Sequence, residues 1–178
     1  AAVYSGLLAY LSSASFVYIE MLGVPVQYFG FIFLSTVAGY VGGSGVSARM
    51  ASRYDSQQTM LLGALLCLLT TIIMWTGATL LTNNIWILML PMTIYAVGMG
   101  LVLPHAMAIA LAPFPHIAGT ASALLGFIQM GLSAIGTAAV GAMLKDSPQP
   151  MLAAMFVINL AAVILSLKAY RQYRSQLT

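Results

Sequence analysis

Hydrophobic residues fill long stretches of this chain, and polar or turn-forming residues interrupt them at short intervals. A helix needs about 20 mostly apolar residues to cross a bilayer, and the turn signals divide the chain into stretches of about that length. We expect membrane-spanning helices over residues 2–19, 26–47, 58–80, 85–107, 119–143 and 150–169. The pattern therefore predicts an all-α membrane protein, a bundle of six transmembrane helices that takes up residues 1–178 as one domain.

The predicted helices differ in how often they are interrupted. The third and the sixth are nearly uniform aliphatic stretches suited to contact with lipid. The fourth contains Pro91 and Pro104, and the fifth carries five glycines between Gly119 and Gly141. A unit whose third and sixth helices are plain fits two three-helix repeats around a central face, as is common in transporters.

The composition excludes the soluble and nucleic-acid-binding classes. Hydrophobic residues make up 61% of the chain and charged residues 5%, so the chain cannot present a charged surface to water. The net charge of +3 is too small and too scattered to indicate a nucleic-acid partner. The single cysteine, Cys67, lies in an apolar run, which excludes a disulfide framework and a thiolate metal site.

The basic residues predict the orientation in the membrane. Lys145 lies on one side of the predicted bundle, accompanied by Glu20 and Asp146. Five basic residues lie on the other side, which both termini share: Arg49, Arg53, Lys168, Arg171 and Arg174. Because positive charge is enriched on the cytoplasmic side, we expect both termini in the cytoplasm.

Several polar and adaptable side chains are candidates for a cavity at the middle of the membrane. Gln129 lies about ten residues into the fifth predicted helix, about 15 Å deep, where an amide either bonds a neighbouring helix or faces a watered cavity. Tyrosine hydroxyls at this depth also need partners, whereas serines can bond their own helix. Aromatic and methionine side chains adapt to varied apolar ligands. The candidates are Tyr10, Ser13, Ser35, Met92, Tyr95, Phe127 and Gln129.

Small residues recur along the fifth predicted helix. Ser133, Thr137 and Gly141 follow one another at four-residue spacing and so share a face. Stripes of this kind let membrane helices approach closely. We therefore expect a helix-packing surface that comprises Gly119, Gly126, Ser133, Thr137 and Gly141.

The sequence offers no constellation for catalysis. It contains no paired carboxylates, no His-Glu-x-x-His and no glycine-rich phosphate loop with its lysine. His105 and His116 have no further ligand at useful spacing, so we expect no metal site and leave pH sensing as a minor option. The chain is not expected to be an enzyme.

Three segments carry a resemblance to a known family. The segments "AYLSSASFVYIEMLGVPVQYFGFIF" at 9–33, "SARMASRY" at 47–54 and "LPHAMAIALAPFPHIAGTASALLGFIQMGLSAIG" at 103–136 are similar to the C-terminal half of the Bcr/CflA drug-resistance transporters. These transporters belong to the major facilitator superfamily, which is built from two six-helix halves. The similarity extends over most of the chain, and its most specific element is the proline-bounded loop entering "AGTASALLG".

The resemblance implies a proton-driven antiporter of the bacterial inner membrane that expels bicyclomycin-like or chloramphenicol-like drugs by alternating access. It implies a cavity lined by the first, second, fourth and fifth helices, and a cytoplasmic gate to which Arg49 and Arg53 contribute. Asp55, Gln57 and Gln58 replace the glycine and basic pair usual in that gate, which implies a weaker latch. The energy source would be the proton gradient, with no other cofactor, and the proton-coupling acidic residue would belong to the N-terminal half.

The chain begins inside an apolar helix without an initiator methionine, so we expect the N-terminal six-helix half to be absent from it. Its partners would then be small-molecule drugs, the lipid bilayer and that missing half. Two alternatives stay open. One is a nucleoside or sugar efflux transporter on the same fold, and the other is an autonomous six-helix membrane protein that acts as an assembly or dimerising partner.

Overall fold

A computed structural model describes residues 1–80, 84–143 and 149–175 of the chain. Within these residues the helices are α1 (Ala2–Ser15), α2 (Val26–Met50), α3 (Ser56–Leu80), α4 (Trp86–Leu111), α5 (Ala118–Met143) and α6 (Gln149–Ser175). A π-helical segment, η1 (Phe16–Met21), continues α1, and a 3-10 turn, η2 (Pro115–Ile117), precedes α5. All six spans are long and apolar enough to cross a membrane, so the predicted six-helix fold class is confirmed.

The helices extend beyond the apolar stretches at several ends. α2 continues to Met50 and α6 to Ser175. Polar residues such as Lys, Arg and Gln are good helix formers, so the end of an apolar stretch marks the membrane surface and does not stop the helix. The turn between η1 and α2 is set by Gly23, which has a φ of 66° in the left-handed region that favours glycine, and by Pro25 just before α2.

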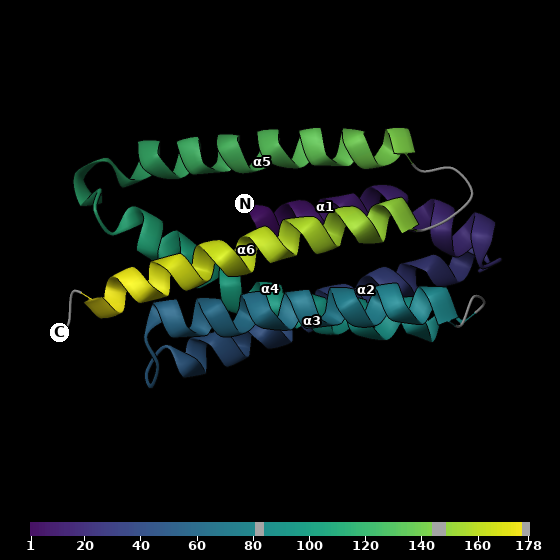
Figure 1. Cartoon of the computed structure of the whole chain (residues 1–178), viewed down its shortest axis with the longest axis horizontal. Coiled ribbons are helices and arrows are strands. Elements are labelled where there is room, and N and C mark those ends of the chain that lie inside the picture. The colour runs from purple at the N-terminus through teal and green to yellow at the C-terminus, as the bar shows by residue number, and fades with distance from the viewer. Residues whose placement is uncertain (81–83, 144–148, 176–178) are drawn as a thin grey trace.

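The packing follows the predicted repeats. α1 packs against α5 and α6, α4 packs against α2 and α3, and α3 packs against α6. The two repeats are α1 to α3 and α4 to α6. The first helix of each repeat packs against the second and third helices of the other repeat. Figure 1 shows the result, with α5 along one edge above α1 and with α2, α3 and α4 on the opposite side.

Close helix packing occurs around α4, and not along α5 as predicted. A Cβ added to Gly43 would meet the backbone of Val97, and one added to Gly63 would lie 2.7 Å from the Gly98 carbonyl oxygen. A Cβ added to Gly100 would lie 2.5 Å from the Ser44 nitrogen. These glycines let the backbones of α2, α3 and α4 approach one another.

The predicted packing surface on α5 is only partly used. Ser133 is fully buried, and its hydroxyl lies 2.8 Å from that of Ser5 in α1. Thr137 is half-buried on the same face. Gly119, Gly126 and Gly141 do not contribute to packing within the described residues, since no described atom lies within 4 Å of a Cβ added to any of them. Only a narrow face of α5 packs on α1, and most of its other residues are exposed.

A buried polar network joins four helices at the centre of the bundle. The Tyr95 hydroxyl in α4 donates to the Val3 carbonyl oxygen in α1 (2.8 Å) and to Asn159 Oδ1 in α6 (3.2 Å). Asn159 Nδ2 donates to Thr71 Oγ1 in α3 (3.1 Å). Gly6 leaves the space that the Tyr95 hydroxyl occupies. The network fixes the rotation of α4 and thereby the direction of its other faces.

Candidate functional site

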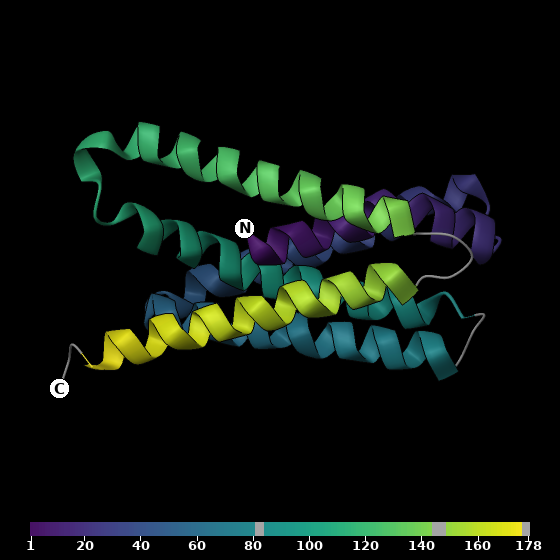
Figure 2. The same cartoon turned by 45° about the horizontal axis from the view of Figure 1, so that its top comes forward.

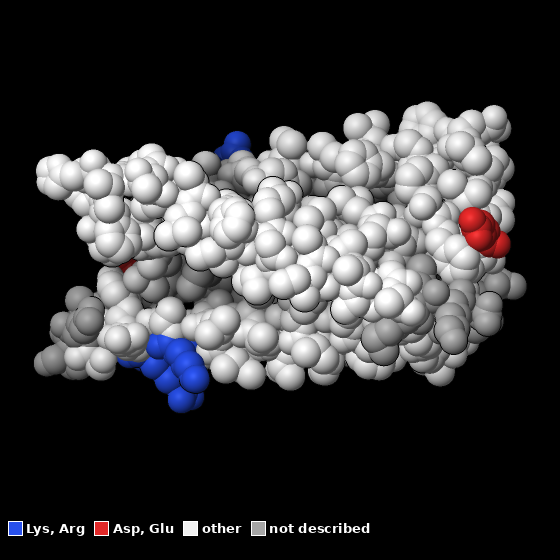
Figure 3. Space-filling model, turned by 90° about the horizontal axis from the view of Figure 1, so that it is seen from above, with Lys and Arg blue, Asp and Glu red and all other residues white. Residues whose placement is uncertain are grey.

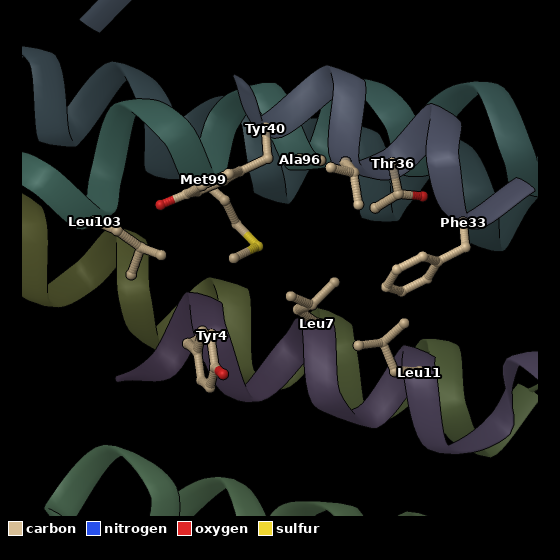
Figure 4. A pocket seen from close by; sticks show the side chains of 10 residues that line it. Tyr4, Leu7, Leu11, Phe33, Thr36, Tyr40, Ala96, Met99 and Leu103 are labelled. Carbon is tan, nitrogen blue, oxygen red and sulfur yellow. The ribbon is translucent and has the colours of Figure 1, made fainter. Parts of the chain in front are cut away.

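A cavity of about 290 Å³ opens between α1, α2 and α4. Figure 4 shows its side chains converging from these three helices. α1 contributes Tyr4, Leu7 and Leu11, whose spacing of three and four residues places them on one helix face. The remaining lining residues come from α2 and α4: Phe33, Thr36, Val37, Tyr40, Ala96, Met99 and Leu103.

A second cavity, of about 370 Å³, continues from the first toward α5. Tyr40 and Leu103 line both cavities. The second cavity adds Pro104 and Met107 from α4 and Gly126 and Gln129 from α5. The two cavities are therefore neighbours and are together called the groove, with α4 lining both, α1 lining the first only, and α2 and α5 forming its rims.

The groove is apolar with a few uncharged polar groups. Its polar side chains are Tyr4, Thr36, Tyr40 and Gln129, and none of its lining residues is charged. Thr36 Oγ1 already donates to the Ile32 carbonyl oxygen (3.3 Å), so it contributes mainly its methyl group. The Tyr40 hydroxyl lies toward the Leu103 end of the first cavity, away from Phe33 (Figure 4). Such a site suits a largely apolar, uncharged ligand that is oriented by hydrogen bonds at one end.

Four predicted cavity residues lie inside the bundle, and their assignment to the cavity is corrected. Tyr10 and Tyr95 are buried, and their hydroxyls bond Tyr18 and the central network respectively. Met92 and Ser13 are also buried, and neither lines the groove. The sequence indicates how deep a polar side chain lies in the membrane but not in which direction it points. A polar residue that bonds a neighbouring helix therefore gives the same sequence signal as one that faces a cavity.

Of the other three candidates, one lines the groove and two do not. Gln129 lines the second cavity. Ser35 is half-buried on α2 beside the groove residue Thr36, and its hydroxyl accepts a hydrogen bond from Thr93 (3.2 Å). Phe127 lines neither cavity and is 77% exposed on α5. The structure therefore brings Gln129 to the groove and leaves Ser35 and Phe127 outside it.

Sequence reasoning missed most of the groove. Tyr40, with a hydroxyl in an apolar helix, carried the same signal that selected Tyr10 and Tyr95. The spacing of Tyr4, Leu7 and Leu11 also indicated one face of a helix, but an apolar face toward a cavity has the same pattern as one toward lipid. Asn159, at the centre of the buried network, was an equally visible signal within an otherwise aliphatic helix.

The two predicted gate arginines lie together at one end of the molecule. Arg49 and Arg53 both line a shallow hollow of about 420 Å³ where α2 turns toward α3. Both are exposed, and the only hydrogen bond that either guanidinium makes within the described residues is a long one from Arg49 to the Gly45 carbonyl oxygen (3.5 Å). Figure 3 shows basic side chains toward this end of the molecule and acidic ones at both ends, and Asp55 lies two residues after Arg53 in the turn toward α3. Lys145 and Asp146 lie outside the described residues.

The described residues hold no cluster of three or more His, Cys, Asp or Glu that could bind a metal ion. His105 is buried in α4, and its Nε2 has no hydrogen-bond partner among the described atoms. His116 is exposed before α5. The two histidines lie on different segments and do not form a joint site.

An apolar groove between helices of two interlocked three-helix repeats defines a transporter-type membrane unit. No protein-family model matches the chain. It is 29% identical over 168 residues to the bicyclomycin resistance protein homolog of Haemophilus influenzae, covering 94% of this chain and 41% of that protein. It is 27% identical over 164 residues to multidrug resistance protein D of Escherichia coli, covering 90% and 40% respectively.

A further relative is an uncharacterised MFS-type transporter of Bacillus subtilis, YdgK, 30% identical over 155 residues, which cover 87% of this chain and 38% of that protein. The homologues of the chain are thus transporters of the major facilitator superfamily, and two of them are named for drug resistance. It spans about two fifths of the length of these relatives, consistent with the C-terminal half of the fold. Members of this superfamily are transporters and not enzymes.

Proposed function

We propose that the chain is the C-terminal half of a proton-coupled multidrug efflux antiporter that works by alternating access. The observation that carries the proposal is the groove itself, which is apolar and is bounded by α1, α2, α4 and α5. Two relatives named for bicyclomycin or multidrug resistance support drugs as the cargo. In a complete transporter this groove would form one wall of the central cavity.

The second half of the transporter would cover the rims of the groove. α2 and α5 are the least buried of the six spans. Their exposed faces carry large apolar side chains, among them Phe31 and Leu34 on α2 and Phe127 and Ile135 on α5. α5 packs mainly on α1 and stands apart from α2 and α3 (Figure 2). A second six-helix bundle seated on α2 and α5 would bury both faces and close the groove into a cavity.

The chemistry of the groove favours drugs over nucleosides or sugars. A sugar presents hydroxyls on every side, and a site that binds it must supply many convergent polar groups. The groove supplies the hydroxyls of Tyr4 and Tyr40 and the amide of Gln129. This is enough to orient an amphiphilic molecule of the bicyclomycin or chloramphenicol kind.

Proton coupling would draw on groups outside this chain. The described carboxylates, Glu20 and Asp55, are exposed at helix ends and lie away from the groove. We therefore expect the proton-binding acid on the other half. The basic end of the molecule would face the bacterial cytoplasm, with Arg49 and Arg53 forming part of the inner gate.

The test is drug efflux by the complete product of the gene in inverted inner-membrane vesicles. We expect uptake of radiolabelled chloramphenicol that an imposed proton gradient drives and a protonophore abolishes, with vesicles from vector-only cells as control. Uptake equal to that control for every drug tested, at confirmed protein abundance, would overturn the proposal. The exposed faces of α2 and α5 would then favour the dimerising alternative, which cross-linking of the purified protein would reveal.

A further inference from the structure

A second hollow lies at the basic end of the molecule, on the side away from the groove. It has a volume of about 470 Å³ and lies between Leu61 of α3 and the last turns of α6. The α6 residues that line it are Leu167, Tyr170, Arg171, Arg174 and Ser175. Their spacing of three and four residues places them along one face of the helix. The hollow is therefore apolar toward the middle of the helix and basic toward its C-terminal end.

The length of α6 places this basic end at the level of the lipid headgroups. α6 has 27 residues, and about 20 of them suffice to cross the hydrocarbon core. The residues after Lys168 therefore extend beyond that core. Figure 1 shows α6 projecting past the neighbouring end of α3. The exposed overhang leaves the basic side chains beside the membrane surface and Leu61 and Leu167 at the depth of the acyl chains.

The charges at this end favour an anion. Lys168, Arg171 and Arg174 follow one another at three-residue spacing, and all three are exposed. The C-terminus of a helix carries a partial negative charge of about half a unit, which three cations outweigh. Tyr170 adds a hydroxyl of the kind that lies at the membrane interface. Basic pockets between transmembrane helices are known sites for acidic phospholipid headgroups.

We propose that this hollow binds an anionic phospholipid, such as phosphatidylglycerol. Its phosphodiester accepts hydrogen bonds from Arg171 and the neighbouring basic side chains, and an acyl chain runs along Leu167 and Leu61. α3 and α6 also pack against each other, so the lipid seals the junction of the two repeats at this surface. The site is separate from the groove and does not depend on what the transporter carries.

The test measures lipid retained by the complete gene product after purification from lipid nanodiscs of phosphatidylcholine with one fifth phosphatidylglycerol, using native mass spectrometry. The double variant Arg171→Gln/Arg174→Gln removes both charges that line the hollow. The matched control, Arg49→Gln/Arg53→Gln, removes two exposed charges from the same end of the molecule. Each basic residue near a membrane surface contributes roughly fivefold in affinity, so we expect roughly 25-fold weaker retention in the double variant and wild-type retention in the control.

Equal retention of phosphatidylglycerol by the wild type and the double variant would overturn the proposal, and so would equal losses in the double variant and the control, which would indicate general surface charge. The single substitution Arg171→Lys keeps the charge and should retain the lipid. Inorganic phosphate added at the same concentration should not displace it, since the acyl chain contributes to binding. If phosphate alone displaced the lipid, the hollow would be a binding site for a free anion and not for a phospholipid.

Discussion

Tyr40 is the polar residue that lines both cavities of the groove, and the other residue they share is Leu103. Around Tyr40 the first cavity is almost wholly apolar, and Gln129 lies on the rim of the second. A ligand that fills both cavities must therefore pass Tyr40. From this position we expect Tyr40 to select among substrates and the leucines beside it to contribute mainly apolar contact area.

Removing the Tyr40 hydroxyl should weaken export selectively. In Tyr40→Phe we expect the apparent KM for chloramphenicol, which carries hydroxyls, to rise roughly three- to tenfold, the value of one hydrogen bond. Export of an apolar dye without hydrogen-bonding groups should stay near the wild-type rate. The matched control is Tyr28→Phe, because Tyr28 is exposed on the same helix and lines neither cavity. An unchanged KM in Tyr40→Phe would exclude this role.

Gln129 offers the corresponding change on the opposite rim. Gln129→Ala should alter the profile of exported drugs while leaving the abundance of the protein intact, because the side chain lines the second cavity and is only half-buried. Minimum inhibitory concentrations for a panel of drugs, with immunoblots of the membrane fraction, measure both quantities. Wild-type resistance to every drug would reassign Gln129 to packing.

At the scale of the helices, α4 is the element around which the others are arranged. It contacts α2 through Gly43 and Gly100, contacts α3 through Gly63 and Gly98, and carries Tyr95 of the central network. It also supplies Ala96, Met99 and Leu103 to the groove. A change in the distance between α2 and α4 should therefore affect folding before it affects transport.

Two adjacent glycines of α2 test this arrangement. Gly43→Ala would place a methyl group on the backbone of Val97, whereas no described atom lies within 4 Å of a Cβ on Gly42. Both substitutions favour the helix equally by propensity, so they differ only in packing. We expect Gly43→Ala to lower the unfolding temperature in detergent and the amount of protein in the membrane, and Gly42→Ala to do neither. The packing account fails if the two variants behave alike.

The same comparison of elements shows what the sequence can predict. The apolar stretches were enough to locate six helices, because the length of a span is set by the membrane. The plain character of the third and sixth stretches was enough to predict the repeats. The rotation of each helix was not predictable, because a membrane helix is apolar on nearly every face. Hence three of the predicted packing residues of α5, Gly119, Gly126 and Gly141, have no neighbour within the described residues, and Tyr95 joins helices where a cavity residue was predicted.

For the whole molecule, the orientation in the membrane is open to a direct test. Cys67 is fully buried, so it should not react with an added thiol reagent. Single cysteines introduced as Ser52→Cys and Glu20→Cys lie at opposite ends and are both exposed in the wild-type protein. In intact spheroplasts a membrane-impermeant maleimide should label the Glu20 position and should label the Ser52 position only after lysis. The reverse pattern would place the basic end outside the cell.

The exchange of helices between the two repeats has a consequence for how the protein is made. Of the six helices, α1 leaves the ribosome before the other five, yet the helices against which α1 packs most are α5 and α6, which follow the other four. α2 and α3 likewise wait for α4 before their glycine contacts can form. The nascent chain must therefore insert most of its helices before the first can find its final neighbours. Its early spans spend that interval protected by lipid or by the insertion machinery, so translation that stops before α5 leaves α1 without a native partner.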